Sequence, residues 1–311
     1  MVIEKTYLIP TTITEALEMA KANIDTFKYL AGGTDVMVNR FQGNESSPCL
    51  IDISKLEELK GIRKEGGFLR IGALEPLEDL KRVQELKDEF PLLIEAALSV
   101  GAPLLRKTAT IGGNVLCENR CLYYNQSEWW REAVGYCLKC EGDICIATQG
   151  KKACFSELVS DTAPALIAME AEIELLDVDG SKRIPLMDIY TGDGVKPRNI
   201  SPTAILTAIF LPLNKGFKGV FNKLRERQSL EFTSLTSAVT LDGDGTIRIV
   251  LSGVDPKPVV VLGKNGDDLS ELIKKAIKGA RAIDNDMYSR KYRREMIGVY
   301  LERSFGELGV K

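Results

Sequence analysis

Six of the seven cysteines lie between residues 117 and 154, and their thiols are the side chains best suited to bind a metal in this sequence. Thiolates are strong ligands for zinc and for iron–sulfur clusters. In a cytoplasmic protein, cysteines at this density indicate metal binding rather than disulfides. The six are Cys117, Cys121, Cys137, Cys140, Cys145 and Cys154. The seventh, Cys49, stands apart on a predicted strand, where we expect a small core residue.

The sequence contains no histidine. This excludes Ser-His-Asp and Cys-His nucleophilic sites, and it limits a zinc or iron–sulfur site to cysteine ligands. The pairs Cys117-x₃-Cys121 and Cys137-x₂-Cys140 have the spacing that is typical of structural zinc. From the residues alone, zinc and an iron–sulfur cluster therefore both remain open.

Two glycine-rich segments are suited to hold an anion. They are Tyr29-Leu-Ala-Gly-Gly-Thr-Asp-Val36 and Thr110-Ile-Gly-Gly-Asn114. Paired glycines allow positive φ and close approach, so that consecutive N–H groups point at a phosphate, and Thr34 and Thr110 can add hydroxyl donors. Neither segment has the form G-x-G-x-x-G, and no G-x-x-x-x-G-K-[ST] occurs, which excludes Rossmann and P-loop sites.

Composition narrows the class of protein. The 311 residues are 44% hydrophobic and 27% charged, with a net charge of −3 and no basic block, so nothing favours nucleic-acid binding. The apolar runs are too short for a membrane-spanning helix. The first residues, Met1-Val-Ile-Glu-Lys5, carry no stretch that is long enough for a signal peptide, and we expect a cytoplasmic protein.

The elements that must position these segments follow from periodicity and from turn residues. Thr12-x-x-Glu15 has the form of a capping box before a helix that runs to about Asn23. We predict strands at 27–31 and 50–53, hairpins over 62–73 and at Asp179-Gly180, helices near 75–83 and 87–99, and Asp161 as a helix cap. Beyond a boundary at 212–219 we predict an antiparallel sheet (219–225, 236–241, 246–252) and two helices (269–281, 287–304). Strands followed by helices favour an α+β class.

The two glycine segments, together with Ser160-Asp-Thr-Ala-Pro-Ala-Leu166 and Phe221-Asn-Lys-Leu-Arg-Glu-Arg227, resemble the flavoprotein of molybdenum hydroxylases, the xanthine dehydrogenase and carbon monoxide dehydrogenase family. The similarity covers essentially the whole chain. It implies an FAD-binding domain of two subdomains over residues 1–213 (the PCMH-like type) and a smaller α+β domain of antiparallel sheet plus helices over 217–311.

The resemblance also implies which residues bind FAD. The glycine segments would hold its pyrophosphate, Val100 would pack near the cofactor, Asp161 would hydrogen-bond it, and Lys223 would lie near the isoalloxazine. The implied FAD residues are Tyr29, Leu30, Ala31, Gly32, Gly33, Thr34, Asp35, Val36, Val100, Thr110, Gly112, Gly113, Asn114, Asp161 and Lys223.

Most members of this family run from the second glycine segment almost directly into the Ser160-Asp helix, whereas this chain carries residues 117–157 there. Cys121-Leu-Tyr-Tyr-Asn-Gln-Ser-Glu-Trp-Trp-Arg131 and Gly135-Tyr-Cys-Leu-Lys139 resemble the insertion in β subunits of 4-hydroxybenzoyl-CoA reductases, which carries a 4Fe-4S cluster. The matching ligands are Cys121, Cys137, Cys145 and Cys154. Cys117 has a counterpart that is not a ligand, and Cys140 departs from the pattern as a spare thiol or as a replacement for Cys145. We expect the aromatic side chains of the loop, Tyr123, Tyr124, Trp129, Trp130 and Tyr136, to seal it from water.

The implied function is electron transfer, with catalytic residues on other subunits. A ferredoxin-like donor would supply the 4Fe-4S cluster, and electrons would pass through FAD to 2Fe-2S centres and molybdopterin on partner subunits for reductive dehydroxylation of 4-hydroxybenzoyl-CoA. One alternative is the FAD subunit of another molybdenum hydroxylase that oxidises a purine, aldehyde or N-heterocycle. Another is a binding or scaffold protein that structural zinc stabilises.

Overall fold

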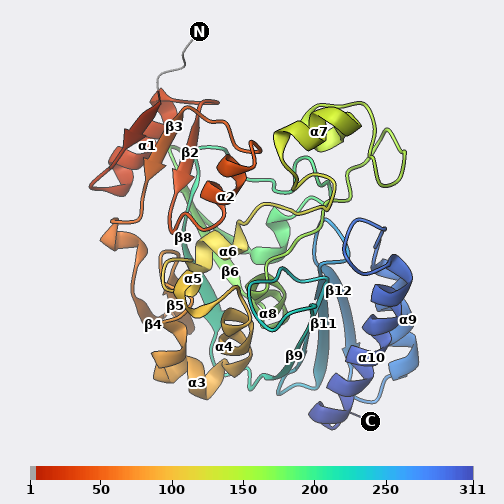
Figure 1. Ribbon diagram of the computed structural model, residues 1–311. Coiled ribbons are helices and arrows are strands. Elements are labelled where there is room, and N and C mark those ends of the chain that lie inside the picture. Colours follow the sequence, from red (N-terminus) through yellow and green to blue (C-terminus); the bar gives the residue numbers. More distant parts are fainter. Residues whose placement is uncertain (1–4, 311) are drawn as a thin grey trace.

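The structure is a computed structural model that describes residues 5–310. Its strands form three sheets, with helices between and around them (Figure 1). Residues 1–4, which carry most of the segment on which the expectation of no signal peptide rests, and Lys311 lie outside the described part. Within residues 5–310, no helix is both long enough and apolar enough to cross a membrane.

The N-terminal part is a small parallel sheet. Its strands β1 (Thr6–Leu8), β2 (Phe27–Leu30) and β3 (Cys49–Asp52) lie in the order β1-β3-β2, beside α1 (Ile13–Ala22) and α2 (Val36–Phe41). Thr12 caps α1 as predicted, accepting from the Glu15 N–H at 3.2 Å. Glu15, however, accepts from the Thr11 N–H at 2.6 Å. Cys49 is buried on β3, which confirms its predicted place in the core.

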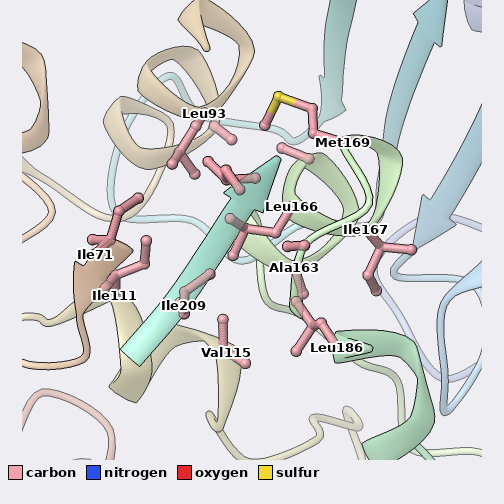
Figure 2. Packing of buried hydrophobic residues seen from close by; sticks show 14 of the residues in the cluster. Ile71, Leu93, Ile111, Val115, Ala163, Leu166, Ile167, Met169, Leu186 and Ile209 are labelled. Atoms are coloured by element: carbon pink, nitrogen blue, oxygen red, sulfur yellow. The ribbon is translucent and has the colours of Figure 1, made fainter. Parts of the chain in front are cut away.

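A five-stranded antiparallel sheet forms the centre of the molecule. Its order is β4 (Ile62–Glu65), β5 (Phe68–Gly72), β8 (Ile205–Pro212), β6 (Glu172–Asp177), β7 (Gly180–Pro185), and both predicted hairpins are present. All residues of β8 are buried. Figure 2 shows Ile209 of this strand in the main core with Ile71 of β5, Ile111 and Leu166.

The chain between β5 and β6 contains α3 (Gln84–Glu89), α4 (Pro91–Leu98), α5 (Pro103–Arg106), α6 (Ile111–Val115), α7 (Glu128–Val134) and α8 (Thr162–Ala168). Helices α3, α4, α6 and α8 contribute buried residues to this core, whereas α7 belongs to the cysteine loop. The helix predicted near 75–83 is only a 3-10 turn at Leu80–Arg82, and the one predicted at 87–99 is divided between α3 and α4. The division falls before Pro91, whose ring nitrogen cannot donate to a preceding carbonyl and therefore begins a new helix.

The C-terminal part is a four-stranded antiparallel sheet with two helices. Strands β9 (Lys218–Leu224), β10 (Leu235–Leu241), β11 (Thr246–Ser252) and β12 (Val259–Lys264) are followed by α9 (Leu269–Gly279) and α10 (Arg290–Leu308). The prediction missed β12. Val239 and Ile249 pack in one core with α9 and α10, whereas their neighbours Ala238 and Val250 belong to the main core with α8. The α+β class is confirmed, and the domain boundaries remain predictions.

Candidate functional site

A large pocket of about 790 Å³ lies where the parallel sheet, the glycine segments and the loop before β10 meet. Every residue that the resemblance assigned to FAD lines this pocket, except Leu30, Gly33 and Lys223. The volume lies in the range of pockets that take large organic ligands. The two glycine segments, far apart in sequence, therefore form one site.

Close backbone contact explains why glycine stands at position 32. A Cβ atom built there would lie 1.8 Å from the carbonyl oxygen of Thr108, so the first glycine segment rests directly on the chain leading into the second. Thr110 caps the short helix α6 by accepting from the Gly113 N–H at 3.1 Å. Because its oxygen accepts that bond, the Thr110 O–H proton is left to donate into the pocket.

Asn114 joins the second glycine segment to α8. Its Oδ1 accepts hydrogen bonds from the Thr162 hydroxyl at 2.7 Å, the Ser160 hydroxyl at 2.9 Å and the Thr162 N–H at 3.2 Å. A side-chain amide has two further donors on Nδ2, and these are what Asn114 can offer to a ligand. The residue thus lines the pocket and also positions the chain around Asp161.

Asp161 occupies the predicted N-cap position of α8, but its side chain does not cap the helix. Its side chain makes no capping bond, and the Ser160 hydroxyl accepts from the Ala163 N–H at 3.1 Å instead. The Asp161 carboxylate accepts from Lys223 Nζ at 2.6 Å and from the Thr236 hydroxyl at 3.2 Å. Burial raises the pKa of Asp161 above its usual range, although Lys223 and Thr236 favour the carboxylate. Lys223 thus reaches the pocket through Asp161.

Sequence reasoning missed several residues of the pocket. Asn39 and Asn44 both line it, and the Oδ1 atom of each is buried without a hydrogen-bond partner in the described structure. Unpaired buried acceptors are costly unless a ligand or water satisfies them. Two such acceptors, together with the glycine turns, fit a polar ligand with several donors, such as a dinucleotide. No motif singles out these asparagines, because they are ordinary residues of and after a short helix.

The four cysteines assigned as cluster ligands come together. Cys121, Cys137, Cys145 and Cys154 line one small pocket, which Tyr124, Phe155 and Ile283 help to wall. Cys140 and Cys117 are not among its lining residues, and Cys117 borders the large pocket instead. Burial raises the pKa of Cys121 to about 12 and raises that of Cys154 as well. A metal would therefore have to displace the protons of Cys121 and Cys154, whereas a hydrogen bond from the Cys140 thiol lowers the pKa of Cys137 to about 6.

The four thiols do not form a preformed single-ion site. Within residues 5–310, no three His, Cys, Asp or Glu side chains are close enough to hold one metal ion. Tetrahedral zinc with Zn–S bonds of about 2.3 Å requires sulfurs roughly 3.8 Å apart. The predicted aromatic seal is only partly correct: Tyr124 is buried, but Trp129 is 75% and Tyr136 40% exposed.

The base of the cysteine loop is held by the C-terminal part of the chain. Arg120 and Glu157 exchange two backbone hydrogen bonds, of 2.9 and 2.7 Å. The Asn285 carbonyl accepts from the Leu122 N–H at 2.9 Å, and its Nδ2 donates to the Phe155 carbonyl at 3.0 Å. Arg293 of α10, fully buried, pairs with the Glu157 carboxylate. These contacts fix the residues adjoining Cys121 and Cys154.

The geometry defines a protein with a large pocket suited to a dinucleotide-like ligand and a second pocket lined by four thiols. Comparison with known proteins identifies the family. Residues 3–214 match the family described as the FAD binding domain in molybdopterin dehydrogenase, and the chain belongs to this family. Its resemblance to FAD-binding medium subunits of the xanthine and carbon monoxide dehydrogenase type is thereby confirmed.

Relatives and solved structures agree with this family. The chain is 30% identical to the aldehyde oxidoreductase FAD-binding subunit PaoB of Escherichia coli over 246 residues, covering 74% of this chain and 76% of the relative. It is 25% identical to the nicotinate dehydrogenase FAD-subunit of Eubacterium barkeri, covering 74% and 67%. The fold is shared with a Cu,Mo-CO dehydrogenase chain, with a TM-score of 0.78 at 22% identity over 97% and 96% of the two chains.

Proposed function

We propose that this chain is an electron-transfer subunit that holds FAD in the large pocket and a 4Fe-4S cluster on Cys121, Cys137, Cys145 and Cys154. The observation that supports the cluster is which of the cysteines line one pocket. Of the six cysteines in the loop, the four that line one pocket are the four that match the ligands of the resembling insertion. Four cysteine thiolates are the ligand set that a 4Fe-4S cluster requires, and these four line one pocket.

The FAD site rests on backbone approach and on fixed polar groups. The turns around Gly32 and Gly113 would hold the pyrophosphate, with the Thr110 hydroxyl beside it. Val100 and Asp161 lie on the pocket wall. Lys223 fixes the orientation of the Asp161 carboxylate. These groups would bind and orient FAD without taking part in proton transfer, which agrees with a chain that lacks histidine.

The proposed chemistry is electron relay. FAD exchanges one or two electrons and a 4Fe-4S cluster exchanges one, so a subunit with both would connect carriers of different kinds. The expected partners are a large molybdopterin-binding subunit and a small 2Fe-2S subunit, with a ferredoxin-like protein as the donor. The cysteine loop resembles the insertion in 4-hydroxybenzoyl-CoA reductases. This resemblance favours electron flow from the donor through FAD to molybdenum, with 4-hydroxybenzoyl-CoA as the substrate of the complex.

The names of the relatives indicate other substrates, including aldehydes and nicotinate. The substrate of the complex to which this chain belongs therefore needs its own test. The complex, purified without oxygen, would be supplied with a low-potential reductant and 4-hydroxybenzoyl-CoA. Formation of benzoyl-CoA is the expected result. Oxidation of hypoxanthine, an aldehyde or nicotinate, with 4-hydroxybenzoyl-CoA left unchanged, would replace the reductase proposal by that of an oxidising hydroxylase. The scaffold alternative is set aside by the membership in an oxidoreductase family.

A further inference from the structure

A buried lysine lies in the wall between the two pockets. Lys139 lines the cysteine pocket together with the four thiols, and its side chain is 5% exposed. Its Nζ donates to Glu118 Oε1 at 2.7 Å and to the Gly194 carbonyl at 2.6 Å. The same ammonium lies 5.1 Å from the centre of the Tyr124 ring. A full positive charge is therefore fixed at the edge of the cysteine pocket.

Glu118, the ion-pair partner of Lys139, faces the FAD pocket. Glu118 lines the FAD pocket, and its second oxygen accepts from Arg198 at 3.3 Å. Tyr124 lines both pockets, so the two sites share a wall at this point. Lys139 and Glu118 thus form an ion pair that crosses the wall, with the cation on the cysteine side.

We infer that Lys139 raises, and Glu118 lowers, the reduction potential of the group held by the four cysteines. This rests on the proposed function, because it presupposes a redox cluster in the cysteine pocket. Reduction adds one negative charge to the cluster. A nearby cation stabilises that charge, and a nearby carboxylate opposes it. Net charge and burial around a cluster are among the properties that set its potential.

Burial distinguishes Lys139 from the exposed lysines of the loop. Lys151 and Lys152 also lie close to Cys154 in sequence, but both are exposed. Water and salt screen an exposed charge strongly, whereas they screen a buried charge much less. The loop therefore offers a matched control: removal of the Lys152 charge alters net charge by the same amount as removal of the Lys139 charge, without altering the interior.

The test is a redox titration of the complex purified without oxygen, followed by the electron paramagnetic resonance signal of the reduced cluster. Lys139→Met should make reduction about tenfold less favourable, a midpoint about 59 mV more negative for one electron. Glu118→Gln should move the midpoint in the opposite direction. Lys139→Arg, which keeps the charge, and Lys152→Met should stay near the wild-type value.

Opposite shifts for Lys139→Met and Glu118→Gln support the inference, because loss of packing alone has no reason to produce opposite signs. Unchanged potentials in both variants, or shifts in the same direction, would overturn it. If Lys139→Met loses its cluster, the direction of the Glu118→Gln shift decides. Wild-type protein that contains no iron would refute the proposed function itself. A cluster that is present but has the same potential in both variants would refute only the role of Lys139 and Glu118.

Discussion

Lys223 on β9 donates a 2.6 Å hydrogen bond to Asp161 at the start of α8, and the two side chains are only 3% and 5% exposed. The same ammonium donates to the carbonyls of Ser99 and Glu231, both at 3.1 Å. The pair thus ties the C-terminal sheet to a residue that lines the FAD pocket.

Removal of Lys223 from its buried pair with Asp161 should lower the stability of the protein more than removal of a lysine from an exposed pair. Lys223→Met leaves the Asp161 carboxylate buried without its cation, and loss of one member of a buried pair costs about 3–5 kcal/mol. We expect a loss of that order in urea unfolding of the FAD-bound protein, together with weaker FAD binding. Lys274→Met, which breaks an exposed pair with Glu271, is the control and should change little. Equal effects of the two substitutions would refute the role of the buried pair.

Gly32→Ala should disrupt FAD binding. The added Cβ would lie 1.8 Å from the Thr108 carbonyl oxygen, so one of the two chain segments must move. Flavin content after purification and the dissociation constant for FAD measure the result, and we expect at least a tenfold weaker complex, about 1.4 kcal/mol. Gly306→Ala, in open space on α10, should instead leave binding unchanged and stabilise the helix by about 0.5–1 kcal/mol. FAD binding by Gly32→Ala at the wild-type level would contradict the assigned pocket.

The cysteines should separate into two groups. Serine at Cys121, Cys137, Cys145 or Cys154 should abolish or severely reduce iron binding yet leave FAD bound, because the glycine segments form a different pocket. Serine at Cys117 or Cys140 should leave the iron content near that of the wild type. Iron and flavin analysis of each variant measures this directly. Loss of iron in Cys140→Ser, with retention in Cys145→Ser, would show that the ligand assignment is wrong at that position.

Acid should remove the contribution of Glu118 to stability. Burial alone raises its pKa, but Lys139 and Arg198 overcome that effect and lower the pKa from 4.5 to about 2. Because the pKa of Glu118 is lower in the folded than in the unfolded protein, its carboxylate stabilises the folded state by about 3 kcal/mol at pH values above about 4.5. This stabilisation is lost as the pH falls from about 4.5 towards 2. The difference in melting temperature between wild type and Glu118→Gln should therefore narrow as the pH is lowered from 6 to 3. A constant difference would contradict the lowered pKa.

Local signals in the sequence predicted much of the fold. The Thr12 cap, the turns at Gly66-Gly67 and Asp179-Gly180, and the order of strands before helices at the C-terminus depend on neighbouring residues, and all are present. The helix break before Pro91 was missed, although proline carries its own local signal. Strand β12 was also missed.

The candidate site could be predicted only where a motif marks it. Glycine pairs and cysteines are recognisable in sequence, and most of them line the two pockets. Asn39, Asn285 and Arg293 carry no such mark, because their roles depend on contacts with segments remote in the chain. The same holds for Lys139, whose importance comes from burial beside Glu118 rather than from its place between two cysteines.

The most direct test of the central proposal is the metal and flavin content of the protein purified strictly without oxygen. We predict one FAD and about four irons per chain, with sulfide and the brown absorption of a 4Fe-4S cluster. FAD accompanied by stoichiometric zinc, or by no metal, would contradict the cluster and leave an ordinary FAD-binding subunit of this family.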